Sequence, residues 1–205
     1  MKRSVLFCVI MVTLFLHSIC IARAPHQVGG FELGKDIADY KEMLRMETSL
    51  PIRHMEYLRE VEIKDMNGFR SGLIHYGTCA VPGRIVRIKL KYADSTKQFY
   101  EKLLQLFKKR FREPTEWRGD PFQVIIAWKW SFVDTENNRI SLILQHNTKD
   151  EEEKRGNSVK LTCWSFIEEE GLCFEKKQPE YGEGRGKEGY ENRDAPINWN
   201  LFIPR

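Results

Sequence analysis

The clearest pattern of hydrophobic and polar positions in this chain runs from Ser95 to Phe132. In the first part, large apolar residues recur every three or four positions, which predicts an amphipathic helix that starts at Ser95 and is ended by Pro114. From 122 to 132 the period changes to two, which is typical of a strand with one buried face. The two stripes predict two layers of one core: Phe99, Leu103, Leu106, Phe107 and Phe111 in the helix, and Val124, Ile126, Trp128, Trp130 and Phe132 in the strand.

The rest of the chain repeats this order of elements. The spacing predicts a helix from Asp36 to about Glu47, and the Asn67-Gly68 pair favours a hairpin turn. Strands are expected at 57–64, 70–77 and 84–92 before the long helix, and at 139–146 and 159–167 after it. We therefore predict an α+β fold with two layers, in which an antiparallel sheet is built from two consecutive α-β-β-β units with both helices on one face.

This layout, with Phe31-Glu32-Leu33-Gly34 ahead of the first helix, resembles two kinds of small exported bacterial domain. One is the outer-membrane assembly factor of the SmpA/OmlA type, and the other is the protein inhibitor of β-lactamases. The resemblance is one of pattern, so it implies an exported two-layer domain and assigns no functional residue.

Residues 1–24 have the layout of a secretory signal peptide. Lys2 and Arg3 precede an apolar run from Val5 to Ile21, and Ala22-Arg23-Ala24 offers a cleavage site. The length of the run leaves an uncleaved membrane anchor, with residues 4–22 retained, as the alternative. A lipoprotein is disfavoured because Ile19 precedes Cys20. On either main interpretation we expect residues 25–205 to be exported, to the periplasm or beyond.

Export changes the charge and the cysteine count. The chain has 33 Lys and Arg against 29 Asp and Glu, but three of the cations lie in residues 1–24, so the exported part has a net charge of +1. We therefore expect no nucleic-acid partner. Three cysteines remain, and an oxidising compartment favours one disulfide. Cys163 and Cys173 are the preferred pair, because 168–171 would form a turn between two strands; pairing of Cys79 with either of them is the alternative.

Residues with chemical potential are few. No phosphate-binding loop, His-Glu-x-x-His, Cys-x-x-Cys or Gly-x-Ser-x-Gly motif occurs, so we predict no catalytic residue, no metal ligand and no cofactor. We interpret His75 near Cys79 as structural rather than as a base and its nucleophile. Glu116 and Asp120 are interpreted as ordinary loop acids rather than as an acid–base pair.

Two surface features have competing interpretations. Trp128 and Trp130 share a face with aliphatic residues, which favours a core position over a platform for sugars. Arg87, Lys89 and Lys91 alternate with apolar residues, which favours a solvated sheet face neutralised by Glu60 and Glu62. The alternative is that this basic row meets phosphate, lipid head groups or an acidic partner.

From 176 the composition becomes rich in Gly, Glu and Lys, so we predict one α+β domain over 25–175 and a disordered tail over 176–205. Apolar residues alternate at the end of the tail, as in a strand: Ile197, Trp199, Leu201 and Ile203. We interpret them as a possible interaction segment that would pair as an extra strand with the edge of a sheet, either in a partner or in the protein itself.

Together these features predict an exported, periplasmic or envelope-associated protein that is not an enzyme and that binds an unknown partner protein. Membrane contact is expected only through an uncleaved N-terminal segment. The alternative is a binder of a small ligand or lipid that uses the sheet face, and a hydrolase is the least favoured.

Overall fold

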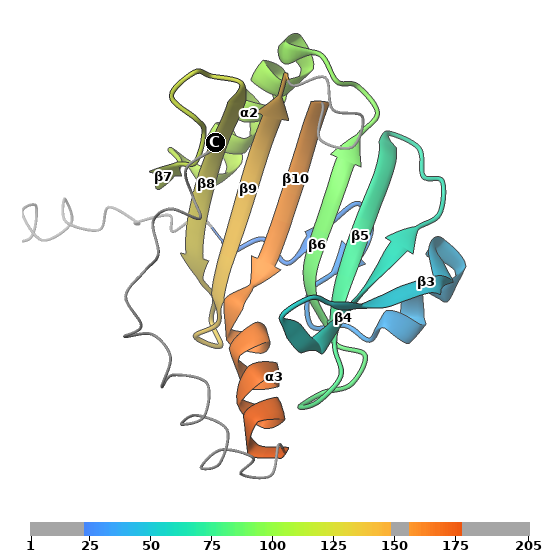
Figure 1. Ribbon diagram of the computed structural model, residues 1–205. Helices are drawn as coiled ribbons and strands as arrows, with labels where there is room; N and C mark the ends of the chain where they lie inside the picture. The colour runs from blue at the N-terminus through green and yellow to red at the C-terminus, as the bar shows by residue number, and fades with distance from the viewer. Residues whose placement is uncertain (1–22, 149–155, 178–205) are drawn as a thin grey trace, which may run out of the picture.

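The computed structural model describes residues 23–148 and 156–177, and it has an α+β fold dominated by an eight-stranded antiparallel sheet (Figure 1). The sheet has the strand order β3-β4-β5-β6-β10-β9-β8-β7. Its strands are β3 (Leu44–Ile52), β4 (Met55–Ile63), β5 (Phe69–Gly77), β6 (Ile85–Tyr92), β7 (Glu116–Trp117), β8 (Ile125–Val133), β9 (Arg139–Asn147) and β10 (Gly156–Cys163). The other elements are the hairpin β1 (Gln27–Val28) and β2 (Phe31–Glu32), the 3-10 helix η1 (Ile37–Met43), and the helices α2 (Lys97–Phe111) and α3 (Trp164–Lys177).

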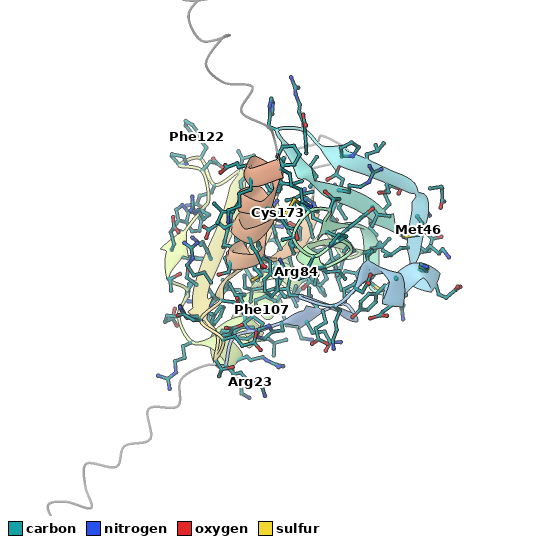
Figure 2. All side chains as sticks on the ribbon, turned by 90° about the horizontal axis from the view of Figure 1, so that it is seen from below. Arg23, Met46, Arg84, Phe107, Phe122 and Cys173 are labelled. Carbon is teal, nitrogen blue, oxygen red and sulfur yellow. A yellow bond between two sulfur atoms is a disulfide. The ribbon has the colours of Figure 1, made fainter. Side chains whose placement is uncertain are left out.

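The two faces of the sheet have different covers. Figure 1 shows α2 and the N-terminal segment behind the strands, whereas α3 lies in front at the lower end of the sheet. In the view from below, Cys173 of α3 lies toward one side, and Phe107 and Arg23 lie toward the other (Figure 2). The arrangement of two α-β-β-β units with both helices on one face is therefore not confirmed. The sheet has eight strands, and the third helix packs on the opposite face from α2.

The core lies between the sheet and the elements behind it. Tyr100 of α2 and Phe31 of β2 are almost completely buried there, and Phe107 of α2 contacts the ring of Trp130 at 5.8 Å between centroids. The sheet contributes one alternating side of each central strand, as the period of two predicts. Its fully buried members are Val61, Ile74, Ile88, Leu90, Leu144, Val159 and Leu161.

Helix α2 has the predicted position but a different cap. The side chain of Thr96, not Ser95, accepts the backbone N–H of Phe99 at 3.2 Å, and this capping bond stabilises the first turn. At the other end, the indole N–H of Trp130 donates to the carbonyl oxygen of Arg112 at 2.9 Å. That bond satisfies a carbonyl group at the helix end and ties α2 to β8.

The first helix is shorter than predicted, and a strand was missed. Asp36 caps η1 as expected, by accepting the N–H of Ala38 at 2.8 Å. The chain becomes extended at Leu44, which pairs with Ile63 and is 1 % exposed. The strand β3 tolerates Pro51 because it lies at the sheet edge and has two register shifts.

The predicted strand 159–167 is wrong beyond Cys163. The chain turns into α3 at Trp164, so the expected turn at 168–171 and the return strand do not exist. Ile167 and Glu170 are the buried residues of α3, three positions apart as on one helix face. The local β propensity of Trp164 to Ile167 favoured a strand, but packing on Leu58 and Val86 selects the helix.

The predicted signal or anchor segment lies outside the described residues up to position 22, and the predicted tail lies outside them from position 178. Ala24, the last residue of the predicted signal, packs into the core. Within the described part of the chain, no helix is long and apolar enough to cross a membrane.

Candidate functional site

The face of the sheet that α2 does not cover carries a cluster of cations, which we call the basic face. It consists of Arg87, Lys89 and Lys91 of β6, Lys160 of β10 and Lys129 of β8. These positions alternate with buried residues such as Ile88, Leu90 and Leu161, so the same period that builds the core places the cations on the other side. Figure 1 is seen from this side, and α3 lies in front at the lower end of the sheet.

The register of the two central strands brings like charges together. Lys160 of β10 lies directly opposite Lys89 of β6. Opposed like charges destabilise a sheet, since the side chains of directly facing residues are close neighbours. Burial lowers the pKa of Lys160, and the charges of Arg87 and Lys89 lower it further. Within residues 23–148 and 156–177, neither Lys89 nor Lys160 forms an ion pair. The opposed ammonium groups of Lys89 and Lys160 create a local positive potential, and such a potential attracts anions.

Arg87 is held in place at the α3 end of the basic face. Its Nε donates to the hydroxyl oxygen of Thr162 at 3.2 Å, and its guanidinium lies 5.6 Å from the ring centroid of Trp164. Trp164 in turn donates its indole N–H to the hydroxyl oxygen of Ser141 at 2.9 Å. Burial lowers the pKa of Arg87, but an arginine so displaced is still fully charged at neutral pH. The cation is thus permanent and oriented.

His75 of β5 is buried beside this cluster. Burial lowers its pKa to about 3, and the charges of Arg87 and Lys89 act in the same direction. The carboxylate of Glu60 lies 3.5 Å from Nε2, but His75 is neutral at pH 7, so this contact is not an ion pair. Neither ring nitrogen has a hydrogen-bond partner among the residues that the structure describes. Because His75 is neutral at pH 7, it adds no charge to the basic face.

The acids of the β7–β8 region are not arranged for acid–base catalysis. Glu116 lies 3.1 Å from the ammonium group of Lys129 and 2.8 Å from Nε of Arg118, and these partners lower its pKa. Asp120 accepts backbone N–H groups of its own loop, above all that of Ile125, and its pKa is lowered as well. A general acid needs the opposite shift. The interpretation of both as ordinary loop acids agrees with these contacts.

A shallow cavity of about 260 Å³ lies in the basic face. Its cationic lining comes from three lysines, and its other lining residues include three side-chain amides and one hydroxyl group. In full, the lining consists of Lys89, Lys91, Lys160, Gln145, Asn147, Asn157, Ser158, Ile125, Ile143 and Gly156. Ammonium and amide N–H groups are donors, so the cavity suits the oxygen atoms of an anionic group.

The preferred disulfide is wrong. Cys79 in the β5–β6 loop is bonded to Cys173 of α3, which lies 94 positions later in the sequence, and Cys163 is a buried free cysteine. The error follows from α3, because Cys173 lies on a helix rather than on a strand that returns beside Cys163. The observed bond is the alternative in which Cys79 pairs with one of the other two cysteines. Because Cys79 has no free thiol in this bond, it cannot act as a nucleophile with His75 as its base. Burial raises the pKa of the Cys163 thiol.

The disulfide lies beside a second anchor of α3. Glu170 is 0 % exposed, and its carboxylate accepts the backbone N–H groups of Cys79, Ala80 and Val81 at 2.7, 3.0 and 2.8 Å. Arg84 lies 3.5 Å from the same carboxylate and 2.7 Å from Glu169. A buried carboxylate with these partners is satisfied, so this cluster fixes α3 beside the basic face.

The tryptophans divide between the core and its margin. Trp130 is 1 % exposed beneath α2, as predicted, and Trp128 is half-buried with its ring 4.7 Å from that of Trp117. The ring of Trp130 is therefore covered and cannot act as a sugar platform, whereas Trp128 lies at the margin of the core beside the exposed Trp117. Among the described residues, no group of three or more His, Cys, Asp or Glu side chains could hold a metal ion.

Sequence reasoning identified three of the five cations and interpreted them as a solvated face. It missed Lys160 and Lys129, although each alternates with apolar neighbours in its own strand. The segment with Ile197, Trp199, Leu201 and Ile203 lies outside the described residues, so its role stays a prediction. Comparisons with protein-family models, with curated proteins and with solved structures find no match to this chain.

Proposed function

We propose that this protein is an exported, non-enzymatic interaction module whose basic face binds an acidic surface of a partner protein. The observation that carries the proposal is the direct opposition of Lys89 and Lys160 on the face of the sheet opposite α2, at a point that none of the described helices covers. This arrangement costs stability in the isolated protein, and an acidic partner would turn the cost into attraction. The disulfide between Cys79 and Cys173 is compatible with the oxidising compartment that export implies.

Two properties favour a protein over a nucleic acid as the partner. The exported part of the chain has a net charge of only +1, so the cations form a local patch rather than a generally basic domain. Sites for single-stranded nucleic acid combine cations with exposed aromatic rings on which bases stack. The lining of the cavity in the basic face has no aromatic residue among those described.

The test uses a fluorescein-labelled poly-L-glutamate peptide and the purified exported chain in an anisotropy titration at 20 and 150 mM NaCl. We expect saturable binding that weakens with salt, because the contacts are between charges at the surface. Lys160→Glu should weaken the binding about tenfold, which corresponds to about 1.4 kcal/mol.

The matched control is Lys102→Glu, which makes the same change of charge at an exposed position of α2 on the other side of the sheet. It should leave the affinity within twofold of the wild type. Equal loss in both variants would mean a nonspecific effect of net charge and would overturn the proposal. Tighter binding of a single-stranded DNA oligonucleotide than of the peptide would also overturn it.

A further inference from the structure

We infer a second, separate site: a cavity on the covered side of the sheet that binds an anionic amphiphile with one long apolar chain. The cavity lies between the N-terminal segment 23–30 and α2, and its volume is about 900 Å³. That volume lies within the range of pockets that hold small ligands. The inference is independent of the proposed function, since it shares no residue with the basic face.

The floor and one wall of the cavity are apolar. Leu142 and Val159 of the central strands form part of the floor beside the ring of Tyr92. The wall from α2 presents Phe107, Phe111 and Leu106. Leu106 is 53 % exposed, although it belongs to the apolar stripe of the helix. An exposed leucine next to half-buried phenylalanines forms an apolar surface in contact with water. Binding of an apolar chain would cover this surface and is therefore favourable.

The other wall is held rigidly by a tight hairpin. Gly29 and Gly30 have φ values of +59° and +82°, which only glycine adopts without strain, and they form the two-residue turn between β1 and β2. A Cβ atom at Gly29 would lie 2.4 Å from a methyl carbon of Leu90, so in a variant with a larger residue either the Leu90 side chain or the hairpin would have to shift. The hairpin therefore packs directly on a core residue of the sheet.

The rim of the cavity is positively charged. Arg23 and Arg110 line it, and neither forms an ion pair within the part of the chain that the structure describes. His26 also lies there, 3.7 Å from the carboxylate of Asp134, and Glu32 is the one carboxylate in the lining. Cleavage after residue 24 would remove Arg23 but would place a charged amino terminus at the same rim.

The combination of parts selects the class of ligand. An apolar wall next to Arg23 and Arg110 matches a molecule that has an apolar chain and one anionic head group, as a long-chain carboxylate has. A fully apolar ligand would leave the arginines unused, and a small polar anion would leave Leu106 of the apolar wall exposed to water. The lining also begins directly after the apolar run that the sequence predicts to enter a membrane, where such molecules are found.

The experiment uses cis-parinaric acid, whose fluorescence rises in apolar sites, with the purified exported chain. We expect saturable binding, and at least tenfold weaker binding for Leu106→Glu and for Arg110→Glu. Both positions are exposed on α2, so the fold should tolerate the changes. The matched controls are Gln105→Glu and Lys109→Glu, neighbouring exposed residues outside the cavity lining, which should bind within twofold of the wild type.

The methyl ester of the probe tests the head group. The wild type should prefer the acid over the ester at least fivefold, and Arg110→Glu should abolish this preference. Co-flotation with phosphatidylglycerol vesicles that Leu106→Glu abolishes would identify a bilayer lipid as the source of the chain, and binding of the free probe alone would identify a free amphiphile.

Three results would overturn the inference: no saturable fluorescence, equal affinity in the cavity variants and their controls, or probe binding only after removal of residues 178–205. The last result would mean that the protein's own C-terminal segment fills the cavity. None of these outcomes affects binding of poly-L-glutamate to the basic face, so the two proposals fail separately.

Discussion

Reversing one charge of the opposed lysines should make the protein more stable. In wild-type protein, Lys89 and Lys160 face each other across β6 and β10 without a carboxylate partner among the described residues. Lys160→Glu would replace this repulsion by a pair of opposite charges. The increase in the free energy of unfolding of Lys160→Glu would then measure how much the opposed lysines destabilise the wild-type protein.

The magnitude follows from the pairing geometry. A directly opposed pair of opposite charges contributes about 0.2–1 kcal/mol, and a like-charged pair costs a similar amount. The reversal therefore spans roughly 0.4–2 kcal/mol, and the partial exposure of both side chains to solvent favours the lower half of this range. For a domain of this size, about 1 kcal/mol corresponds to a rise of roughly 2–4 °C in Tm.

The assay is urea and thermal denaturation of the wild type, Lys160→Glu, Lys89→Glu and the double variant. Each single variant should gain stability, and the double variant should return close to the wild type because two glutamates again face each other. Lys102→Glu should change stability by less than about 0.5 kcal/mol, as surface substitutions usually do. A loss of stability in both single variants, or additive gains in the double variant, would refute the reasoning.

Three further predictions concern groups around the basic face and α3. His75 has its pKa lowered from 6.5 to about 3 in the folded state, so its contribution is complete above pH 6.5 and is lost as the pH falls toward 3. As the pH falls from 6.5 to 5, the free energy of unfolding of the wild type should decrease by up to about 1.4 kcal/mol per pH unit. The slope should be smaller in His75→Gln, and equal slopes would contradict this prediction. Glu170→Gln should lower the free energy of unfolding, measured in urea, by about 2–4 kcal/mol, because the amide can replace only one of the two acceptor oxygens that hold three N–H groups. A loss below about 0.5 kcal/mol would show that the carboxylate does not anchor α3. Cys79→Ser should lower the free energy of unfolding by about 4–5 kcal/mol, since the bond to Cys173 joins positions 94 residues apart in the sequence. A reductant should lower the stability of the wild type to the same value, and no response to reductant would mean that this disulfide does not form.

Local pattern was enough for the elements in the middle of the chain. The three-and-four spacing in α2 and the alternation in β8 each depend on one segment, and both were predicted close to their observed bounds. Helix α3 was missed because its key residue is Glu170, a buried acid. Its partners are backbone N–H groups about ninety residues earlier in the chain, and no local pattern contains that information. The wrong disulfide followed directly from this error.

The basic face shows the same limit at the candidate site. The alternation of Arg87, Lys89 and Lys91 was visible in one strand, and each strand alone predicts a solvated face. The site appears only when β10 pairs with β6 in the register that brings Lys160 opposite Lys89, and these strands are about seventy residues apart in sequence. Edge strand β3 was missed for a different reason, since its first residues were assigned to the helix predicted from Asp36 to about Glu47.

The most direct test of the account is photo-crosslinking in living cells with p-benzoylphenylalanine placed at Ser158, which lines the cavity in the basic face, or at Lys102 on α2. The account predicts one discrete protein adduct from position 158, its loss when Lys160→Glu is added, and no such adduct from position 102. The same adducts from both positions, or an adduct from position 158 that survives Lys160→Glu, would contradict it.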